Sequence, residues 1–325
     1  MKEKNPIYLT EQGSVLTQKG QRLLVRHREK GKIDIPLHHI DRIAIFGNIQ
    51  ITTQAERLCL INQVPIFLLS STGKYLGAIR GESCRQVVLR KKQYLKSEDP
   101  SFCLSLAQEI VRAKIHNSRI FLLRLNRQNR LLISKEAISQ LGKFLILAIR
   151  CKTLDSLRGI EGSAARYYFQ ALAQALPPDF KMPGRNSRPP KDPVNALLSL
   201  GYVLLTGIVN SCLRMSGLDP AAGFFHQGRT GTPNLALDMV EEWRAVIVDP
   251  IVLGMLNLKV LHIGDFIFSD EDGVYLEKPA LRKFLSYFER RMGGEDGFFK
   301  RIDQQVWRLS SALEQDKVYQ AYRWK

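Results

Sequence analysis

The chain has 325 residues, which as a prior suggests two domains, and 45% of them are hydrophobic, so a sizeable core can be buried. Its 48 Lys and Arg residues against 31 Asp and Glu give a formal charge of +17. Such an excess favours a polyanionic partner, because each neutralised phosphate releases condensed counterions. We therefore rank nucleic acid first, an ordinary basic protein second and an anionic membrane surface third.

The cysteines and the apolar runs exclude several classes of protein. Five cysteines are scattered and never form C-x-x-C, which argues against a disulfide framework and a zinc module. The N-terminus lacks the apolar stretch of a signal peptide. The longest uncharged run, residues 195–210, is shorter than the roughly 20 apolar residues of a membrane span. We expect a soluble, cytoplasmic protein in which this run is a core helix.

The first 80 or so residues have the pattern of short strands. Gly13 and Gly20 are turn signals, and Thr52 or Thr53 is placed to cap one helix, TQAERLCLINQ. Strands are expected near residues 7–9, 14–16, 22–26, 33–36, 42–46, 65–69 and 75–79. The sequence therefore predicts an N-terminal β-rich domain over residues 1–82.

From Gly81 onward the apolar period becomes helical. Helices are expected at 84–98, from about 101, and at 131–152, 155–175, 192–216, 234–247, 279–292 and 303–323. The predicted fold is α+β, with a larger, mainly α-helical domain over residues 83–325. Six prolines interrupt it at 177–193, PPDFKMPGRNSRPPKDP, and a long basic loop of this kind is more often functional than decorative.

Four side chains are candidates for binding a catalytic cation. Glu161 lies in RGIEGSAARYYF, and His226 lies in the Gly-rich GLDPAAGFFHQGRTG. Asp238 and Glu241 lie three residues apart in PNLALDMVEEW, hence on one face of a helix. Hard cations take oxygen ligands, and a single imidazole favours Mn²⁺ without excluding Mg²⁺.

Each candidate also has a purely structural interpretation. Glu161 near a helix start complements the helix dipole, worth about 0.3–1 kcal/mol, and from spacing alone we prefer that interpretation. His226 follows two phenylalanines and is explained equally well by packing, and Glu241 by a solvated helix face. Asp238 is the exception, because an acid among apolar neighbours is either paired or functional.

The order of the motifs resembles one family. GIEGSAARYYF, DPVNALLSLGYVLL, GLDPAAGFFHQGRTGTPNLALDMVEEWR and DGVYLEKPALRKFLSYFE are similar to successive signatures of the CRISPR-associated integrases of the adaptation module. The layout of β domain and helical domain matches too, so the resemblance covers nearly the whole chain. One departure is Trp243 before Arg244, followed by Ala245 where many members have proline.

The resemblance implies an activity and a set of residues. Glu161, His226 and Asp238 correspond to the family's metal-binding catalytic triad, and Glu241 lies where members often carry another acid. With Mg²⁺ or Mn²⁺, a 3′-hydroxyl of new spacer DNA would attack the CRISPR repeat, and water in its place would give endonuclease activity. The family also implies a homodimer through the β domain and a small ferredoxin-like partner protein.

Residues 110–135 carry many cations and no acid, which favours contact with the DNA backbone. Other sides of the same helix are apolar, so a basic surface and a buried surface are expected. The proposed DNA contacts are Arg112, Lys114, Arg119, Arg124 and, in the proline-rich loop, Arg185 and Arg188. A further basic cluster is Arg85, Arg90, Lys91 and Lys92.

Three other functions stay open on the sequence. A structure-specific endonuclease on branched DNA would use the same metal site and differ only in its nucleophile. A non-catalytic nucleic-acid scaffold would keep binding after Glu161, His226 and Asp238 are replaced. An RNA-binding module is less favoured, because the aromatic strand pattern of such modules is missing.

Overall fold

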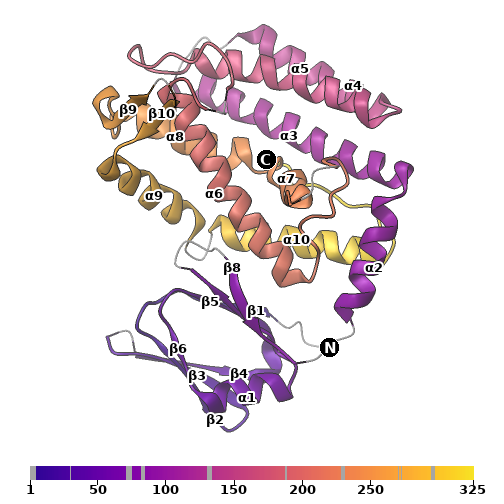
Figure 1. Ribbon diagram of the computed structural model, residues 1–325, viewed down its shortest axis with the longest axis vertical. Coiled ribbons are helices and arrows are strands. Elements are labelled where there is room, and N and C mark those ends of the chain that lie inside the picture. Colours follow the sequence, from indigo (N-terminus) through magenta and orange to yellow (C-terminus); the bar gives the residue numbers. More distant parts are fainter. Residues whose placement is uncertain are drawn as a thin grey trace. The chain divides into compact units, whose positions relative to one another are not determined.

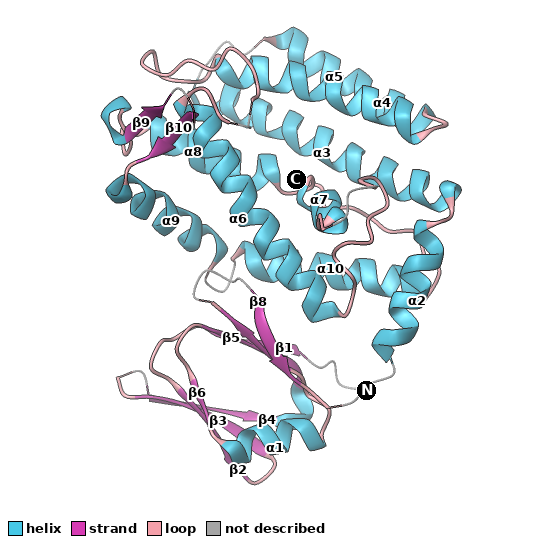
Figure 2. Cartoon of the chain, in the orientation of Figure 1, coloured by secondary structure: helices cyan, strands magenta, loops and turns pink. Residues whose placement is uncertain are grey.

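The computed structural model describes residues 5–29, 31–70, 75–81, 85–129, 134–186, 189–227, 231–269, 271, 273–293 and 297–325. The chain divides into two compact units, residues 1–88 and 89–325. Strands dominate the first unit and helices the second (Figures 1 and 2). The expected α+β class is therefore confirmed, whereas the predicted boundary between residues 82 and 83 lies outside the described residues.

The N-terminal unit contains two four-stranded sheets. Their strand orders are β1-β5-β7-β8, parallel except for β8, and β4-β3-β2-β6, in which β6 alone pairs in parallel. The strands are β1 (Asn5–Leu9), β2 (Val15–Lys19), β3 (Arg22–His27), β4 (Gly31–Pro36), β5 (Ile40–Phe46), β6 (Gln50–Ile51), β7 (Ile66–Leu69) and β8 (Tyr75–Ile79). Helix α1 (Thr53–Ile61) begins where expected, because the Thr52 hydroxyl accepts a hydrogen bond from the Ala55 amide.

The second unit is built from helices and one hairpin. Helix α2 (Arg85–Ser97) leads into it, and Asp99 caps the 30-residue α3 (Pro100–Asn129) by accepting from the Ser101 and Phe102 amides. The remaining elements are α4 (Lys135–Arg150), α5 (Leu154–Ala173), α6 (Pro193–Ser216), α7 (Asn234–Val240), the π-helical η2 (Arg244–Val248), α8 (Asp249–Asn257), β9 (Phe266–Ser269), β10 (Gly273–Leu276), α9 (Lys278–Met292) and α10 (Phe298–Glu314).

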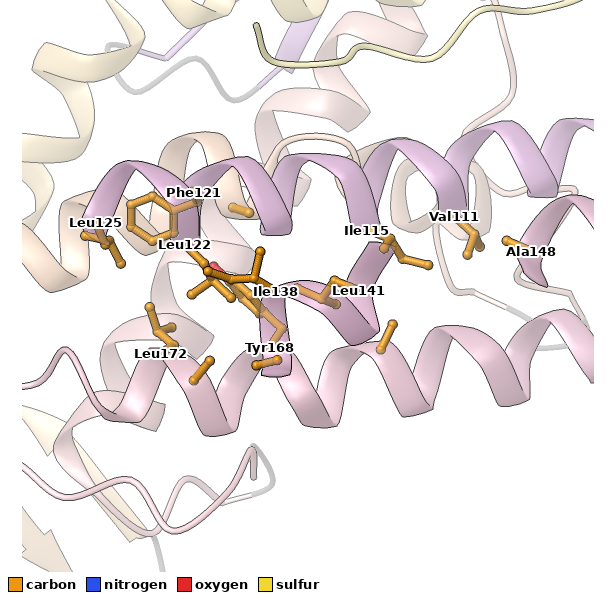
Figure 3. Close-up of a cluster of buried hydrophobic side chains, with 14 of the residues drawn as sticks. Val111, Ile115, Phe121, Leu122, Leu125, Ile138, Leu141, Ala148, Tyr168 and Leu172 are labelled. Carbon is orange, nitrogen blue, oxygen red and sulfur yellow. The ribbon is translucent and has the colours of Figure 1, made fainter. Parts of the chain in front are cut away.

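Helices α3, α4 and α5 share one hydrophobic core. Side chains at helical spacing, such as Ile115 and Leu122 of α3, pack with Leu141 of α4 and with Tyr168 and Leu172 of α5 (Figure 3). Because α3 is covered on this side by both other helices, it runs through the unit as a central element. On other sides it contacts α7 and η2 of the same unit.

Helix α6 is long and apolar enough, by length and composition, to cross a bilayer. However, 61% of its most apolar window is buried within the chain's own core. Asp192 caps its start, and Gly217, at a φ of 92°, ends it in the left-handed conformation that glycine adopts at little cost. These features support the expected core helix.

Two helix predictions were wrong in their bounds, and one hairpin was missed. The helix expected over 234–247 stops at Val240, and a turn then leads into η2. The helix expected over 303–323 begins at Phe298 and ends at Glu314. Asp316 has a φ of 56°, which redirects the chain, and residues 317–325 form a tail without helix or strand. The hairpin β9–β10 was not anticipated, because its strands are only four residues long.

The tail is held by side chains of α3 and by Glu242. Asn117 donates to the Glu242 and Tyr322 carbonyls and accepts from the Trp324 amide. The Glu242 carboxylate accepts from the Tyr319 hydroxyl at 2.7 Å and from the Tyr322 amide at 2.6 Å. Burial raises the pKa of Glu242 to about 8 despite these two hydrogen bonds. The tail thus satisfies a buried acid next to Glu241.

We predict that Tyr319→Phe lowers the free energy of unfolding by about 1–3 kcal/mol, because it leaves a buried carboxyl oxygen without its donor. Urea denaturation followed by circular dichroism measures the change. Tyr275→Phe, which removes an exposed hydroxyl, is the matched control and should leave stability unchanged. Equal stability of the two variants would contradict this role for the tail.

Candidate active site

Glu161 lies on α5, well inside the helix. The Thr153 hydroxyl caps the start of α5 by accepting from the Ser156 amide, and Glu161 comes almost two turns later. The helix-dipole interpretation is therefore weakened, because that effect falls off within the first turn. The Glu161 side chain is 23% exposed, and its carboxylate forms an ion pair with Lys114 of α3.

Asp238 organises the loop that carries His226. Its carboxylate is fully buried and accepts four hydrogen bonds. One oxygen accepts from the Phe224 and Phe225 amides at 2.7 and 3.0 Å, and the other from the His226 amide and the His226 Nδ1 at 2.8 and 2.7 Å. Gly223 makes this loop possible, because a Cβ there would lie 2.5 Å from the His226 carbonyl oxygen.

This hydrogen bonding decides what His226 can do. Nδ1 facing a carboxylate carries the proton, so in the neutral ring Nε2 is left as the basic atom. The His226 side chain is 38% exposed, which keeps it accessible. Arg158, one turn before Glu161, donates to the Phe225 carbonyl at 2.9 Å and so connects this loop to α5. Asp238 thus orients an imidazole beside the helix that carries Glu161.

Glu241 follows α7 and points toward α3. Its side chain is only 5% exposed, and its two oxygens lie 3.1 Å from Arg244 and 2.7 Å from Lys114 Nζ. Burial opposes ionisation, but the Arg244 and Lys114 charges outweigh it and hold the pKa of Glu241 below its usual value. His226 acts in the same direction, which places the imidazole within electrostatic reach of Glu241.

A cavity of about 30 Å³ lies beside Glu161 and Glu241. Glu161, Lys114, Glu241 and Arg244 line one part of it. Asp249, Tyr168 and Tyr202 also line it, and both tyrosine hydroxyls donate to the Asp249 carboxylate, at 2.5 and 2.7 Å. Tyr168 thus lies in the cavity wall, whereas Tyr167 packs against Phe144.

The acids and the histidine of this region differ in whether they can offer an atom to a divalent cation. In the part of the chain that the structure describes, no three His, Cys, Asp or Glu side chains are already arranged around one point. The Asp238 oxygens are fully engaged, whereas the Glu241 oxygen nearest Lys114 is buried and receives no well-directed hydrogen bond. Two carboxylates and one imidazole nitrogen fit Mn²⁺ or Mg²⁺, so Glu161, Glu241 and His226 are a chemically suitable set.

The four candidate DNA contacts on α3 are partly exposed, and each has a partner within the chain. Arg112 pairs with Glu109, and Lys114 with Glu161 and Glu241. Arg119 donates to the Ile138 carbonyl, and Arg124 stacks over Trp324 and donates to the Lys325 carbonyl. Contact between these residues and DNA stays a prediction.

The other basic candidates also have partners within the chain. Arg185 donates to Asn195 and Ser199 and lies over the Tyr202 ring, so the proline-rich loop is tied to α6. Arg90 donates to the Gly217 carbonyl, and Lys92 to the Glu314 carbonyl, whereas Lys91 is exposed. Arg188 lies outside the described residues, as does the side chain of Arg85.

Sequence reasoning missed Arg244, Asp249 and Tyr202 as parts of this cavity. Tyr202 and Asp249 lie in apolar runs, where a polar residue is a signal of a buried network. Arg244 was not singled out, because it follows two acids in a segment expected to be one helix through residue 247.

A pH dependence follows from Asp249. Burial raises its pKa from 3.8 to about 6 against the effect of the two tyrosine hydrogen bonds. The folded state then holds the proton more tightly than the unfolded state, so this contribution to stability is present below pH 4 and is lost as pH rises through about 6. Relative to Asp249→Asn, the free energy of unfolding of the wild type should fall by on the order of 3 kcal/mol between about pH 4 and pH 6. Parallel stability curves in urea at pH 4–7 would exclude this role.

Comparison with known proteins identifies the family. A family model described as CRISPR associated protein Cas1 matches residues 7–290. The CRISPR-associated endonuclease Cas1 3 of Thermus thermophilus is 37% identical over 289 residues, which are 88% of this chain and 84% of that protein. The CRISPR-associated endonuclease Cas1 1 of Chlorobaculum tepidum is 34% identical over 297 residues, covering 89% of this chain and 87% of that protein.

Solved structures of related proteins have the same fold as this chain. A chain of a partial Cas6-RT-Cas1–Cas2 complex superimposes with a TM-score of 0.85 at 26% identity, covering 99% of both chains. A casposase bound to its integration product gives a TM-score of 0.81 over 96% of both chains, and at 22% identity that likeness shows the fold alone. The chain belongs to the Cas1 family of CRISPR-associated proteins.

Proposed function

We propose that this chain is a metal-dependent DNA integrase of CRISPR adaptation with associated endonuclease activity. The observation that carries the proposal is that α5 and the turn after α7 bring Glu161 and Glu241 to one cavity, while Asp238 orients His226 on a loop that Arg158 joins to α5. Family membership and relatives named as endonucleases support the same chemistry.

The proposed ligands are Glu161, Glu241 and the Nε2 of His226. Asp238, ranked above Glu241 on the sequence, takes the supporting position, because its four hydrogen bonds leave it no oxygen to offer. A carboxylate behind a ligating histidine fixes the ring and raises its basicity. When bound, Mg²⁺ or Mn²⁺ would activate the attacking oxygen and offset charge on phosphorus.

The reaction conserves the number of phosphodiester bonds. The 3′-hydroxyl of a spacer fragment loses its proton and attacks a phosphate of the CRISPR repeat. A new P–O bond to the fragment forms as the bond to the repeat's own 3′ oxygen breaks, and that oxygen leaves as a hydroxyl. No ATP is needed, since one ester replaces another. Water in place of the fragment gives hydrolysis from the same site.

The proposed partners are double-stranded DNA, a second copy of the chain and a small ferredoxin-like protein. The charge of +17 supports DNA binding. The solved likeness comes from a Cas1–Cas2 complex, which supports a protein partner. In the N-terminal unit, Ile33, Ile61 and Leu76 are more than 60% exposed, and such apolar side chains suit contact with a second copy. The four cysteines with described side chains form no disulfide, which suits a reducing cytoplasm.

Two other functions remain as outcomes of the test. An endonuclease on branched DNA would use the same residues with water as the only nucleophile. A scaffold would use none of them for chemistry. The expected reaction therefore has to show joining as well as cutting.

We predict that the protein, with its small partner and Mn²⁺ or Mg²⁺, joins short duplex DNA to a supercoiled plasmid that carries the repeat. His226→Ala and Glu241→Gln should each reduce joining at least about 100-fold, because each removes a ligand. Gel electrophoresis of labelled fragments measures the products. Blocked 3′ ends should abolish joining, and His38→Ala, at an exposed histidine of the N-terminal unit, should leave it unchanged.

Cutting without joining, lost in His226→Ala, would establish the endonuclease instead. Full DNA binding with no reaction by the wild type or any variant would support the non-catalytic scaffold function instead.

A further inference from the structure

Lys114 occupies an unusual position between two acids. Its ammonium contacts Glu161 of α5 and lies 2.7 Å from Glu241, and its side chain is only 14% exposed. The three groups come from three different elements, α3, α5 and the turn after α7. The Lys114 ammonium therefore lies between the two carboxylates that were proposed above as metal ligands.

Stabilisation of the fold is not a sufficient reason for this arrangement. Removing charges from water costs several kcal/mol per ion, and well-packed apolar residues often serve the fold as well or better. Here two acids and one lysine are held together, with Arg244 on the other oxygen of Glu241. Such an accumulation of charge in a nearly buried place suggests a role toward a ligand.

The Lys114 ammonium contacts the same two carboxylates that would hold a divalent cation at the proposed site. The cavity beside it, about 30 Å³, has room for little more than one or two waters. Because Mg²⁺ usually keeps several of its waters, it would need the room that the ammonium fills.

We propose that Lys114 is an intramolecular counter-ion of Glu161 and Glu241 that competes with the divalent cation for these two carboxylates. The inference rests on the proposed metal site. Before the cation binds, the ammonium neutralises the repulsion between the two acids. When the cation binds, like-charge repulsion displaces the ammonium, and the flexible four-carbon stem of lysine allows this without movement of α3.

Two opposite consequences follow from removing the charge while keeping the bulk of the side chain. Lys114→Met eliminates the competitor, so the divalent cation should bind more tightly. The same substitution leaves one buried and one partly buried acid without their shared ammonium, so the fold should be weaker when no divalent cation is present. A purely structural lysine predicts the second effect without the first.

The test is Mn²⁺ binding to the full-length protein, measured by titration calorimetry and by the electron paramagnetic resonance of free Mn²⁺. Lys114→Met should bind Mn²⁺ about tenfold more tightly than wild type, as expected for strongly coupled charges. Lys114→Arg should not bind it more tightly than wild type, because the charge is retained. Lys143→Met, at an exposed lysine of α4, is the matched control and should match wild type.

Thermal unfolding gives the second readout. In EDTA, Lys114→Met should melt below wild type, and Mn²⁺ should raise its melting temperature by more than it raises that of wild type. Equal or weaker Mn²⁺ binding by Lys114→Met would overturn the competition.

A mutant cycle over Lys114, Glu161 and Glu241 separates this inference from the metal site itself. In EDTA, Lys114→Met combined with Glu161→Gln and Glu241→Gln should cost less stability than the separate effects added together. If the stability effects are coupled in this way but no variant binds Mn²⁺, Lys114 is a counter-ion of the two acids. That result would overturn both the proposed metal site and the competition. Strictly additive effects would overturn the counter-ion.

Discussion

The functional region depends on bringing like charges together in a place that water barely reaches. Glu161 and Glu241 come from elements that are far apart in sequence, and both are held by the ammonium of Lys114. Each acid alone would be costly to bury, and two side by side would repel. The position of α3 resolves this conflict, since its apolar residues anchor it against α4 and α5 while one lysine reaches the acids.

A second set of polar contacts keeps the neighbouring chain segments in place. Asp238 holds the loop before it through three backbone amides and one imidazole nitrogen. Asn117 of α3 holds the C-terminal tail, and Glu242 is satisfied by that tail. Because nearly all these groups are buried, each lost hydrogen bond would leave an uncompensated partner. The precision of the site thus derives from polar groups that have no chemical role of their own.

The sequence predicted the architecture well, and the site only in part. Alternation and turn signals located the β-rich unit, and Thr52 marked the start of α1 correctly. Arginines and lysines over residues 110–135 predicted DNA contacts on α3, but periodicity does not reveal that Lys114, Arg119 and Arg124 have partners on other elements. The sequence placed the end of this helix too late, because residues 315–323 contain no proline that would end it. Only contacts with other elements, such as that of Tyr322 with Glu242, keep this segment out of the helix.

The three acids Asp238, Glu241 and Glu242 show most clearly what local sequence leaves undetermined. All lie within five residues, yet one organises the histidine loop, one faces Lys114 and the cavity, and one meets the tail. Their separation depends on the end of α7 at Val240, since a continued helix would place Asp238, Glu241 and Glu242 along one face. Tertiary packing ends the helix there and turns the last two acids in different directions. A carboxylate near a metal ligand in sequence is therefore assigned its role by the environment into which the backbone delivers it.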